Sequence, residues 1–247
     1  MRSPGALGTW CQLPSPLAGE ILARAGYDWV LVDLQHGAGT VETAAAIVQS
    51  ISVGGALPLV RVPWNDGWLI GRALDIGAAG VVVPLVNSAA EGGRAAAACR
   101  YAPAGTRSFG PLRLPPAIEG GVLCIVMVET REAVEHVDEI CAVPGVDGVF
   151  IGPSDLALSH GLEGPGPETE PAIARVLDAC RRAGIAAGLH CPSGEAAQAR
   201  LAQGFSFAAV SGDLDLLLKA ARRELAAALG EPPSRPDGPD GLVRVAL

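Results

Sequence analysis

Acidic side chains follow two short apolar runs of this sequence at places where they could share a metal ion. Glu129 follows the apolar run 123–128, and Asp155 comes soon after the run 148–151. No basic residue stands beside Asp155, so the two carboxylates could hold one divalent cation. Oxygen ligands with open water positions suit Mg²⁺, Mn²⁺ or Co²⁺ better than structural zinc. Each carboxylate taken singly is also typical of an N-cap of the next helix.

An arginine and a histidine add two further groups of chemical interest. Arg61 lies inside the apolar run 57–62, and an arginine is costly to bury unless it is paired or binds an anion. It could form a structural salt bridge with Asp33 or Glu129, or it could hold a substrate carboxylate. His36 stands in a Gln-His-Gly turn. It could act as a general base or only cap a loop.

Short β-type runs that alternate with longer Ala/Leu-rich runs must position these groups. The expected strands, most of them rich in Val, Ile and Leu, are Leu7–Cys11, Trp29–Asp33, Leu57–Val62, Gly80–Pro84, Leu123–Val128, Gly148–Ile151, Ala186–Leu189 and Phe207–Val210. Helices are expected near 15–25, 40–53, 66–77, 88–100, 130–141, 168–183, 194–204 and 213–229. Continuous apolar runs are typical of strands buried on both faces of a parallel sheet. The pattern predicts an α/β fold, a (β/α)8 TIM barrel, with an open doubly wound sheet as the alternative.

The chain divides into one domain and a tail. Residues 1–229 are expected to form the single barrel domain, and residues 230–247, rich in Pro and Gly, a flexible C-terminal tail. The Pro/Gly-rich segment 113–121 is expected to be a loop over the mouth of the barrel. Chemistry in such a barrel sits at the C-terminal ends of the strands, where all four groups above would meet.

Composition excludes several classes of partner. The 18 Lys and Arg against 26 Asp and Glu give a net charge of −8, which makes nucleic acid or an anionic membrane surface a poor partner. No apolar run approaches the roughly 18 residues of a transmembrane helix, and no signal-peptide pattern follows Met1. The six cysteines show no CxxC spacing and lie in apolar segments, which predicts buried thiols and a cytoplasmic location.

Several stretches resemble the HpcH/HpaI family of metal-dependent (class II) pyruvate aldolases, within the phosphoenolpyruvate/pyruvate barrel superfamily. The matching stretches, which span roughly residues 8–226 in the family's order, are 25–37, 58–66, 74–78, 100–107, 129–133 and 144–156. The last one combines a strand, a Gly-Pro turn and a metal-type aspartate, and is the most specific of them.

This resemblance implies roles for named residues. It implies that Glu129 and Asp155 bind the divalent cation (Mg²⁺, Mn²⁺ or Co²⁺), that Arg61 positions and stabilises pyruvate enolate, and that His36 handles the proton of the aldol hydroxyl. Asp75 matches the acid of a His–Asp dyad. Because it lies about 13 Å along a helix from the rim, we hypothesise that it orients His36 of a neighbouring subunit.

The resemblance also implies a substrate pocket. The backbone around Gly152, Pro153 and Ser154 is expected to offer N–H groups to the substrate carboxylate. Met127 stands where many members have Gln, which changes a substrate contact. The implied reaction is reversible aldol cleavage of a 4-hydroxy-2-oxo acid, of the 2-dehydro-3-deoxy-sugar-acid or the 4-hydroxy-2-oxo-dioate type, to pyruvate and an aldehyde. The implied partners are these small molecules, with a homo-oligomer, a hexamer or trimer of dimers, as the assembly.

Two alternative functions remain open on sequence grounds. A lyase of the same superfamily acting on a CoA thioester, of the citramalyl- or malyl-CoA type, would need a basic groove for the CoA phosphates. A non-catalytic barrel subunit would require loss of a metal carboxylate or of the arginine, and both are kept here. A Schiff-base aldolase requires a strand lysine, whereas Lys219, in the last helix, is the chain's single lysine.

Overall fold

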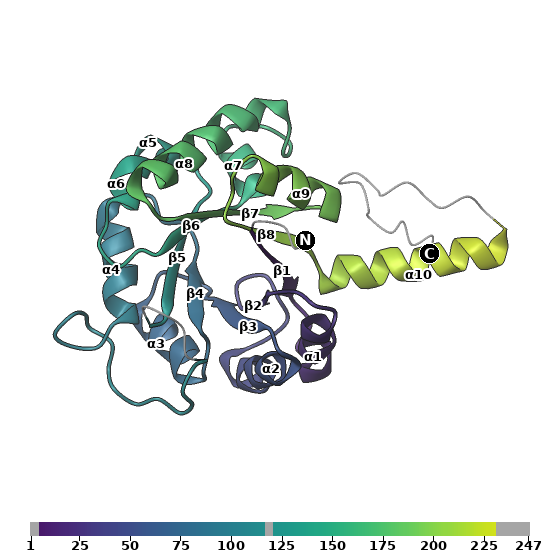
Figure 1. Cartoon of the computed structure of the whole chain (residues 1–247), viewed down its shortest axis with the longest axis horizontal. Helices are drawn as coiled ribbons and strands as arrows, with labels where there is room; N and C mark the ends of the chain where they lie inside the picture. Colours follow the sequence, from purple (N-terminus) through teal and green to yellow (C-terminus); the bar gives the residue numbers. More distant parts are fainter. Residues whose placement is uncertain (1–4, 117–120, 231–247) are drawn as a thin grey trace, which may run out of the picture.

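The computed structural model describes residues 5–116 and 121–230, and it contains a closed barrel of parallel strands in chain order (Figure 1). The strands are β1 (Ala6–Cys11), β2 (Trp29–Asp33), β3 (Leu57–Arg61), β4 (Gly80–Val83), β5 (Leu123–Val128), β6 (Gly148–Ile151), β7 (Ala186–Cys191) and β8 (Phe207–Gly212). All eight predicted strands are present within one or two residues of their expected ends. The predicted TIM barrel is therefore confirmed, and the doubly wound alternative is wrong because β8 pairs with β1.

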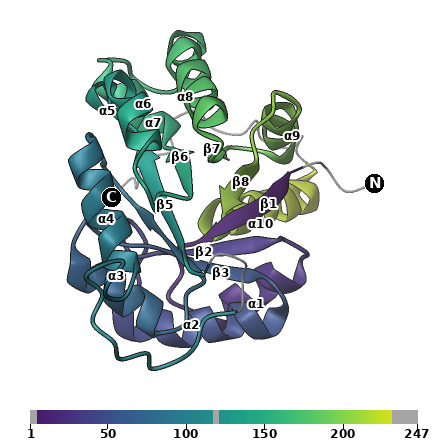
Figure 2. The same ribbon diagram turned by 60° about the vertical axis from the view of Figure 1, so that its left-hand side comes forward.

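Helices surround the strands in both views of the ribbon (Figures 1 and 2). They are α1 (Pro16–Arg24), α2 (Val41–Gly54), α3 (Gly67–Asp75), α4 (Ala89–Cys99), α5 (Arg131–Glu135), α6 (Val137–Cys141), α7 (Pro153–Ser159), α8 (Glu170–Ala183), α9 (Gly194–Ala202) and α10 (Asp213–Leu229), with a 3₁₀ turn at Pro167–Thr169. The helix expected over 130–141 is instead two short helices separated by His136, and α7 was not expected. In the described ranges, no helix has the length and apolar character needed to cross a membrane.

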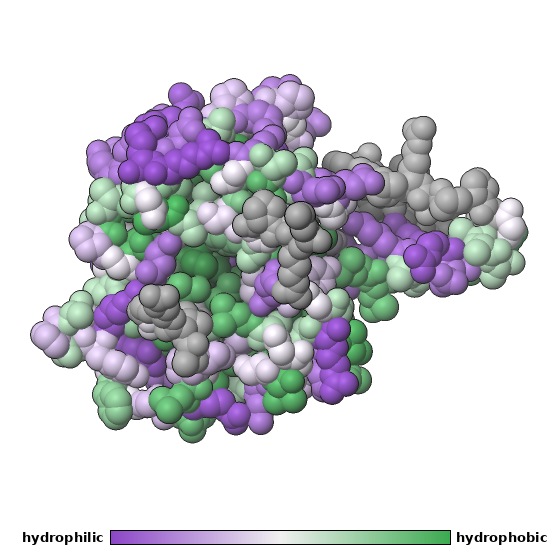
Figure 3. All heavy atoms as spheres, viewed as in Figure 1, coloured by the Kyte–Doolittle hydropathy of each residue, from purple (hydrophilic) through white to green (hydrophobic). Residues whose placement is uncertain are grey.

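The last helix, α10, leaves the barrel instead of packing along it (Figure 1). Of its 17 residues, only Asp213 and Ala226 are buried. Apolar side chains are visible along it in Figure 3, and its exposed leucines are Leu214, Leu217, Leu218, Leu225 and Leu229. The expected C-terminal tail, 230–247, lies outside the described residues except for Gly230.

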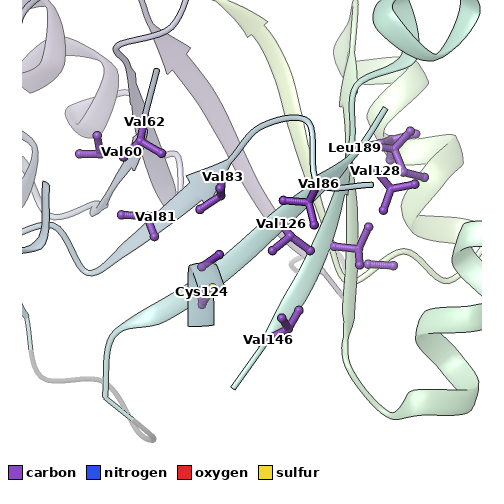
Figure 4. Close-up of a cluster of buried hydrophobic side chains, with 14 of the residues drawn as sticks. Val60, Val62, Val81, Val83, Val86, Cys124, Val126, Val128, Val146 and Leu189 are labelled. Carbon is purple, nitrogen blue, oxygen red and sulfur yellow. The ribbon is translucent and has the colours of Figure 1, made fainter. Parts of the chain in front are cut away.

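Alternate residues of each strand enter two different apolar layers, as the pleat requires. The outer layer, between strands and helices, includes Val60, Val81 and Val126 (Figure 4). All six cysteines are free and belong to this buried layer, as predicted. The inner layer fills the barrel and includes Leu59 and Met127. A polar residue that continues an inward series therefore faces the mouth of the barrel.

The segment before β5 lies at the opposite end of the barrel from that mouth. The N–H groups of Leu112 and Arg113 both donate to the carbonyl of Asp75, the last residue of α3. The expectation that 113–121 covers the mouth is wrong for its described residues, 113–116 and Gly121. The reason is topological, since a connection from a helix to the next strand must return to the N-terminal end of the barrel.

Candidate active site

A cavity of about 260 Å³ opens at the C-terminal ends of the strands, where enzymes of this architecture carry out chemistry. Its lining comes from several strand ends and from the start of α7. The lining residues are Trp10, Gln12, His36, Arg61, Met127, Phe150, Gly152, Pro153, Ser154, Asp155, His190, Ser211, Gly212 and Asp215. Eight of the nine predicted site residues lie in this lining or, in the case of Glu129, directly behind it.

Arg61 is held in the wall of the cavity by Asp33. Its Nε donates to Asp33 Oδ1 at 2.9 Å and its Nη2 to Asp33 Oδ2 at 2.7 Å, a two-pronged buried pair. The guanidinium carbon also lies 4.2 Å from the centre of the Trp10 ring. Burial acts to raise the pKa of Asp33, but the hydrogen bonds and charge of Arg61 outweigh it and hold the pKa below its usual value. The remaining nitrogen, Nη1, keeps its N–H groups for a ligand.

The same aspartate fixes the turn that carries His36. The backbone N–H groups of Gln35 and His36 both donate to Asp33 Oδ1, at 3.0 and 3.2 Å. This local pattern is an Asx-type turn, which stabilises a sharp change of direction after a strand. His36 is exposed and lines the cavity. Asp33 therefore positions both the guanidinium and the imidazole.

Glu129 is a fully buried carboxylate with one oxygen left without a partner. Oε1 accepts a 2.8 Å hydrogen bond from the N–H of Leu85, whereas Oε2 has no partner. Burial raises the pKa of Glu129 to about 7, and the charge of Asp155 adds to the rise, while the Leu85 N–H and the charge of Arg61 oppose it. A buried carboxylate oxygen without a donor is costly. This oxygen is available to a cation.

The surroundings of the two carboxylates fit a divalent cation. A Cβ added at Gly152 would lie 2.4 Å from Glu129 Oε2, so the glycine keeps a path open between that oxygen and the cavity. Asp155 is half-buried in the lining beside it. In the described ranges, no cluster of three or more His, Cys, Asp or Glu side chains could hold a metal ion. Two protein carboxylates with remaining positions for water and substrate suit Mg²⁺ or Mn²⁺.

Asp75 lies away from this cavity, at the far end of α3. Its Oδ1 accepts a 2.7 Å hydrogen bond from Nη2 of Arg107, whose guanidinium stacks on Tyr101 at 4.6 Å. The N-terminus of α3 begins near the mouth, so the helix places Asp75 about 13 Å away from it. Within one chain, Asp75 and His36 therefore do not meet.

Several cavity residues were not part of the predicted site, among them Trp10, His190 and Ser211. Trp10 supports Arg61, and His190 and Ser211 form part of the opposite wall. The sequence could have indicated them through the alternation along their strands, because each residue continues a series of inward-facing positions. His190 and Cys191 are neighbours in sequence but could not bind one metal ion together, because Cys191 belongs to the outer layer whereas His190 faces the cavity.

Known proteins share both the sequence and the fold of this chain. The sequence model described as HpcH/HpaI aldolase/citrate lyase matches residues 6–220. The chain is 43% identical over 235 residues to a hydroxypyruvate/pyruvate aldolase of Rhizorhabdus wittichii, covering 90% of this chain and 93% of that protein. It is 38% identical to a 4-hydroxy-2-oxo-heptane-1,7-dioate aldolase of Shigella sonnei, covering 91% and 90%.

A solved structure agrees with these matches. The crystal structure of an HpcH/HpaI aldolase/citrate lyase family protein from Burkholderia cenocepacia J2315 superposes with a TM-score of 0.85 and 33% sequence identity. The superposition covers 91% of this chain and 95% of the Burkholderia chain. The similarity thus extends over the whole barrel, including every strand end that lines the cavity.

Proposed function

The chain belongs to the HpcH/HpaI aldolase/citrate lyase family, and we propose that it catalyses reversible aldol cleavage of a 4-hydroxy-2-oxo acid to pyruvate and an aldehyde. It is accordingly a carbon–carbon lyase. The observation that carries the proposal is the buried, unpartnered Oε2 of Glu129 beside Asp155, opposite an arginine whose Nη1 is unused. That arrangement concentrates positive charge, once a cation binds, where an enolate oxygen would form.

Bond changes in this reaction define what the residues must do. The C3–C4 bond breaks, its electron pair forms the C2–C3 double bond of pyruvate enolate, and the C4 hydroxyl loses a proton as the aldehyde forms. His36 lines the cavity and accepts that hydroxyl proton as general base. Arg61 directs Nη1 toward the C2 oxygen, where negative charge develops, and Asp33 keeps the guanidinium from rotating. C3 of the enolate then takes a proton to give pyruvate.

Glu129 and Asp155 would hold the divalent cation (Mg²⁺, Mn²⁺ or Co²⁺), which supplies Lewis-acid stabilisation of the developing enolate charge when bound. The backbone at Gly152 and Ser154 receives the substrate carboxylate, with Pro153 fixing the turn. Met127 is fully buried and gives the pyruvate side of the cavity an apolar contact. These assignments use every predicted residue at the mouth of the barrel.

A CoA-thioester lyase is a weaker candidate. Arg61 is the one Lys or Arg among the described cavity-lining residues, and it is already paired with Asp33. The phosphates of CoA require several unpaired cations. A cavity of about 260 Å³ instead suits a short 2-oxo acid.

We also infer that the enzyme works as a homo-oligomer, the hexamer or trimer of dimers that the family resemblance implies. Large apolar side chains are exposed near Asp75, including Phe109 at 79%, Leu112 at 73% and Leu114 at 79%. Together with the leucines of α10, they form apolar surface of the kind that marks subunit interfaces. In such an assembly Asp75 of one subunit would reach His36 of another and orient it.

An aldol assay tests the proposed function. Purified enzyme is supplied with pyruvate and a short aldehyde, with EDTA or with added Mg²⁺, Mn²⁺ or Co²⁺, and aldol formation is measured. We expect activity with the cations and a loss of at least about 100-fold in Glu129→Ala and Asp155→Ala. Glu135→Ala, an exposed carboxylate on α5, is the control and should keep full activity. Metal-independent turnover, or full activity in either site variant, would reject the proposal.

A further inference from the structure

The wall of the cavity formed by β7 and β8 carries polar groups that the proposed mechanism does not use. His190 and Ser211 face the cavity from neighbouring strands. Arg61 lies across the barrel on β3, and Asp155 follows β6, next to β7. A pyruvate unit held between Arg61 and the carboxylates would therefore leave its C4 side facing His190 and Ser211.

A β-bulge lies at the place where Ser211 lines this cavity. On the β1–β8 pair, Gly8 is opposite Ala209 but Trp10 is opposite Gly212, so β8 contains one extra residue there. Ser211 has a φ of 55°, in the left-handed region that favours glycine. Bulges are common next to functional sites. A serine kept at a strained position that glycine would fill without strain indicates a use for its hydroxyl.

The hydroxyl of Ser211 is buried but unpaired. The residue is 2% exposed, and its Oγ has no hydrogen-bond partner. A buried hydroxyl without a partner costs free energy, and the open side of this one is the cavity. A ligand hydroxyl that donates to or accepts from Oγ would remove that cost.

His190 supplies a second polar group at the same place. Burial lowers the pKa of His190, against the opposing effect of a hydrogen bond to the backbone of Ser211. The ring is therefore neutral near pH 7, with one nitrogen bound to that backbone and the other able to bond a ligand. The edge of the Trp10 ring packs against it with ring centres 5.9 Å apart, which fixes its orientation.

Charge at the rim restricts what can bind there. Asp215 lies in the cavity lining, Asp33 neutralises Arg61, and the nearby Lys219 ammonium donates to the carbonyl of Pro192. A second carboxylate on the aldehyde side, as in the semialdehyde released from a 4-hydroxy-2-oxo-dioate, would meet the carboxylate of Asp215. An uncharged ligand hydroxyl would instead meet the Ser211 hydroxyl, which can donate or accept a hydrogen bond, and an imidazole nitrogen of His190.

We propose that His190 and Ser211 form the subsite for the aldehyde half of the substrate and select an uncharged 2-hydroxyaldehyde over an alkyl or carboxylated aldehyde. This inference rests on the proposed function, because it assumes pyruvate on the Arg61 side. Both residues act by binding the hydroxyl of the incoming aldehyde. They therefore determine specificity and leave enolate formation untouched.

Two aldehydes of nearly equal size test the subsite. Glycolaldehyde and propanal differ by a hydroxyl in place of a methyl group, and succinic semialdehyde adds a carboxylate. We expect wild-type kcat/KM to fall in that order. Ser211→Ala and His190→Leu should each lower kcat/KM for glycolaldehyde about tenfold, and change that for propanal less than about twofold. Ser211→Gly removes the same oxygen and the backbone strain, so it should match Ser211→Ala in selectivity with equal or higher thermal stability.

A second measurement separates this inference from the proposed function. Exchange of the pyruvate methyl protons with D₂O, followed by NMR without aldehyde, reports enolate formation alone. Wild type, Ser211→Gly and His190→Leu should exchange at similar rates. The variants could exchange protons normally and yet keep the wild-type ratio of kcat/KM for glycolaldehyde to kcat/KM for propanal. That result would overturn the subsite and leave the proposed function standing. Absence of exchange in wild type would instead overturn the proposed function, and with it the subsite.

Discussion

Asp33 organises more of the site than any residue singled out from the sequence. Arg61 could be read from sequence as a salt-bridge partner or as a substrate ligand, and the pair with Asp33 satisfies the first reading with two of its three nitrogens. The same carboxylate holds the turn of His36. The residue types alone could not distinguish a salt-bridge role of Arg61 from a substrate-binding role, because they do not tell which guanidinium nitrogen faces the ligand.

The raised pKa of Glu129 should make the stability of the metal-free protein depend on pH in an unusual way. Its pKa of about 7 lies above the ordinary 4.5, so between those pH values the native carboxyl keeps a proton that the unfolded chain has lost. The free energy of unfolding should therefore fall as pH rises through this window, by up to about 3 kcal/mol. A divalent cation binds the ionised form, so its stabilisation should grow over the same range.

Thermal melting with EDTA and with Mn²⁺, at about pH 5.5 and about pH 7.5, checks this dependence. The shift produced by Mn²⁺ should be larger at the higher pH, and Glu129→Gln should show little shift at either. Glu135→Gln, whose side chain is 63% exposed, should behave as wild type. An equal Mn²⁺ shift at both pH values would contradict the raised pKa.

At the scale of strands and helices, alternation predicted most of the architecture. Runs such as Leu57–Arg61 and Leu123–Val128 are apolar on both faces because one face meets helices and the other fills the barrel. Counting inward positions along them leads to Arg61 and Glu129 at the mouth. The same count along β8 passes through Phe207 and Ala209 and leads to Ser211, although a bulge shifts the register against β1 there. Only the three-dimensional structure shows that the Ser211 hydroxyl is buried without a partner, so its role could not be predicted.

The turn after β6 gives a prediction about access to the metal. In Gly152→Ala, the new Cβ would lie 2.4 Å from Glu129 Oε2 and 3.2 Å from Cε of Met127. The backbone of Gly152 has a φ of −95°, which alanine accepts, so the effect comes from the Cβ alone. We expect Mn²⁺ affinity, measured by calorimetry, to fall at least about tenfold, together with aldol activity. Gly164→Ala, where nothing lies within 4 Å of a Cβ, is the matched control; wild-type affinity in Gly152→Ala would contradict the proposed site.

At the scale of the whole molecule, a single chain leaves large apolar surfaces exposed to water. α10 leaves the barrel with its leucines exposed, and the surface around Asp75 carries Phe109, Leu112 and Leu114. Burial of such surface between subunits would remove a large apolar area from water, at about 25 cal/mol per Å². Sequence could suggest an oligomer by resemblance, but the exposed faces are visible only once the helices are placed around the barrel.

Subunit mixing tests whether Asp75 acts on the His36 of a neighbour. His36→Ala and Asp75→Asn should each be strongly impaired as pure proteins. When the two are unfolded, mixed in equal amounts and refolded together, about a quarter of the sites should pair an intact His36 with an intact Asp75 from another chain. Activity should therefore recover to about a quarter of the wild-type level. Asn at position 75 keeps an oxygen for the hydrogen bond from Arg107, which protects the fold.

A matched mixture makes this result specific. His36 and Arg61 line one cavity of one chain, so mixing His36→Ala with Arg61→Ala cannot rebuild a site and should give no recovery. Recovery in both mixtures would mean that subunit exchange merely stabilises the variants. Full activity of Asp75→Asn alone, or no recovery in the first mixture, would show that the Asp75 carboxylate pairs only with Arg107 of its own chain and does not act on His36 of a neighbour. Recovery in the first mixture alone is the outcome that a shared site requires, because no other arrangement brings the end of α3 to the mouth of a barrel.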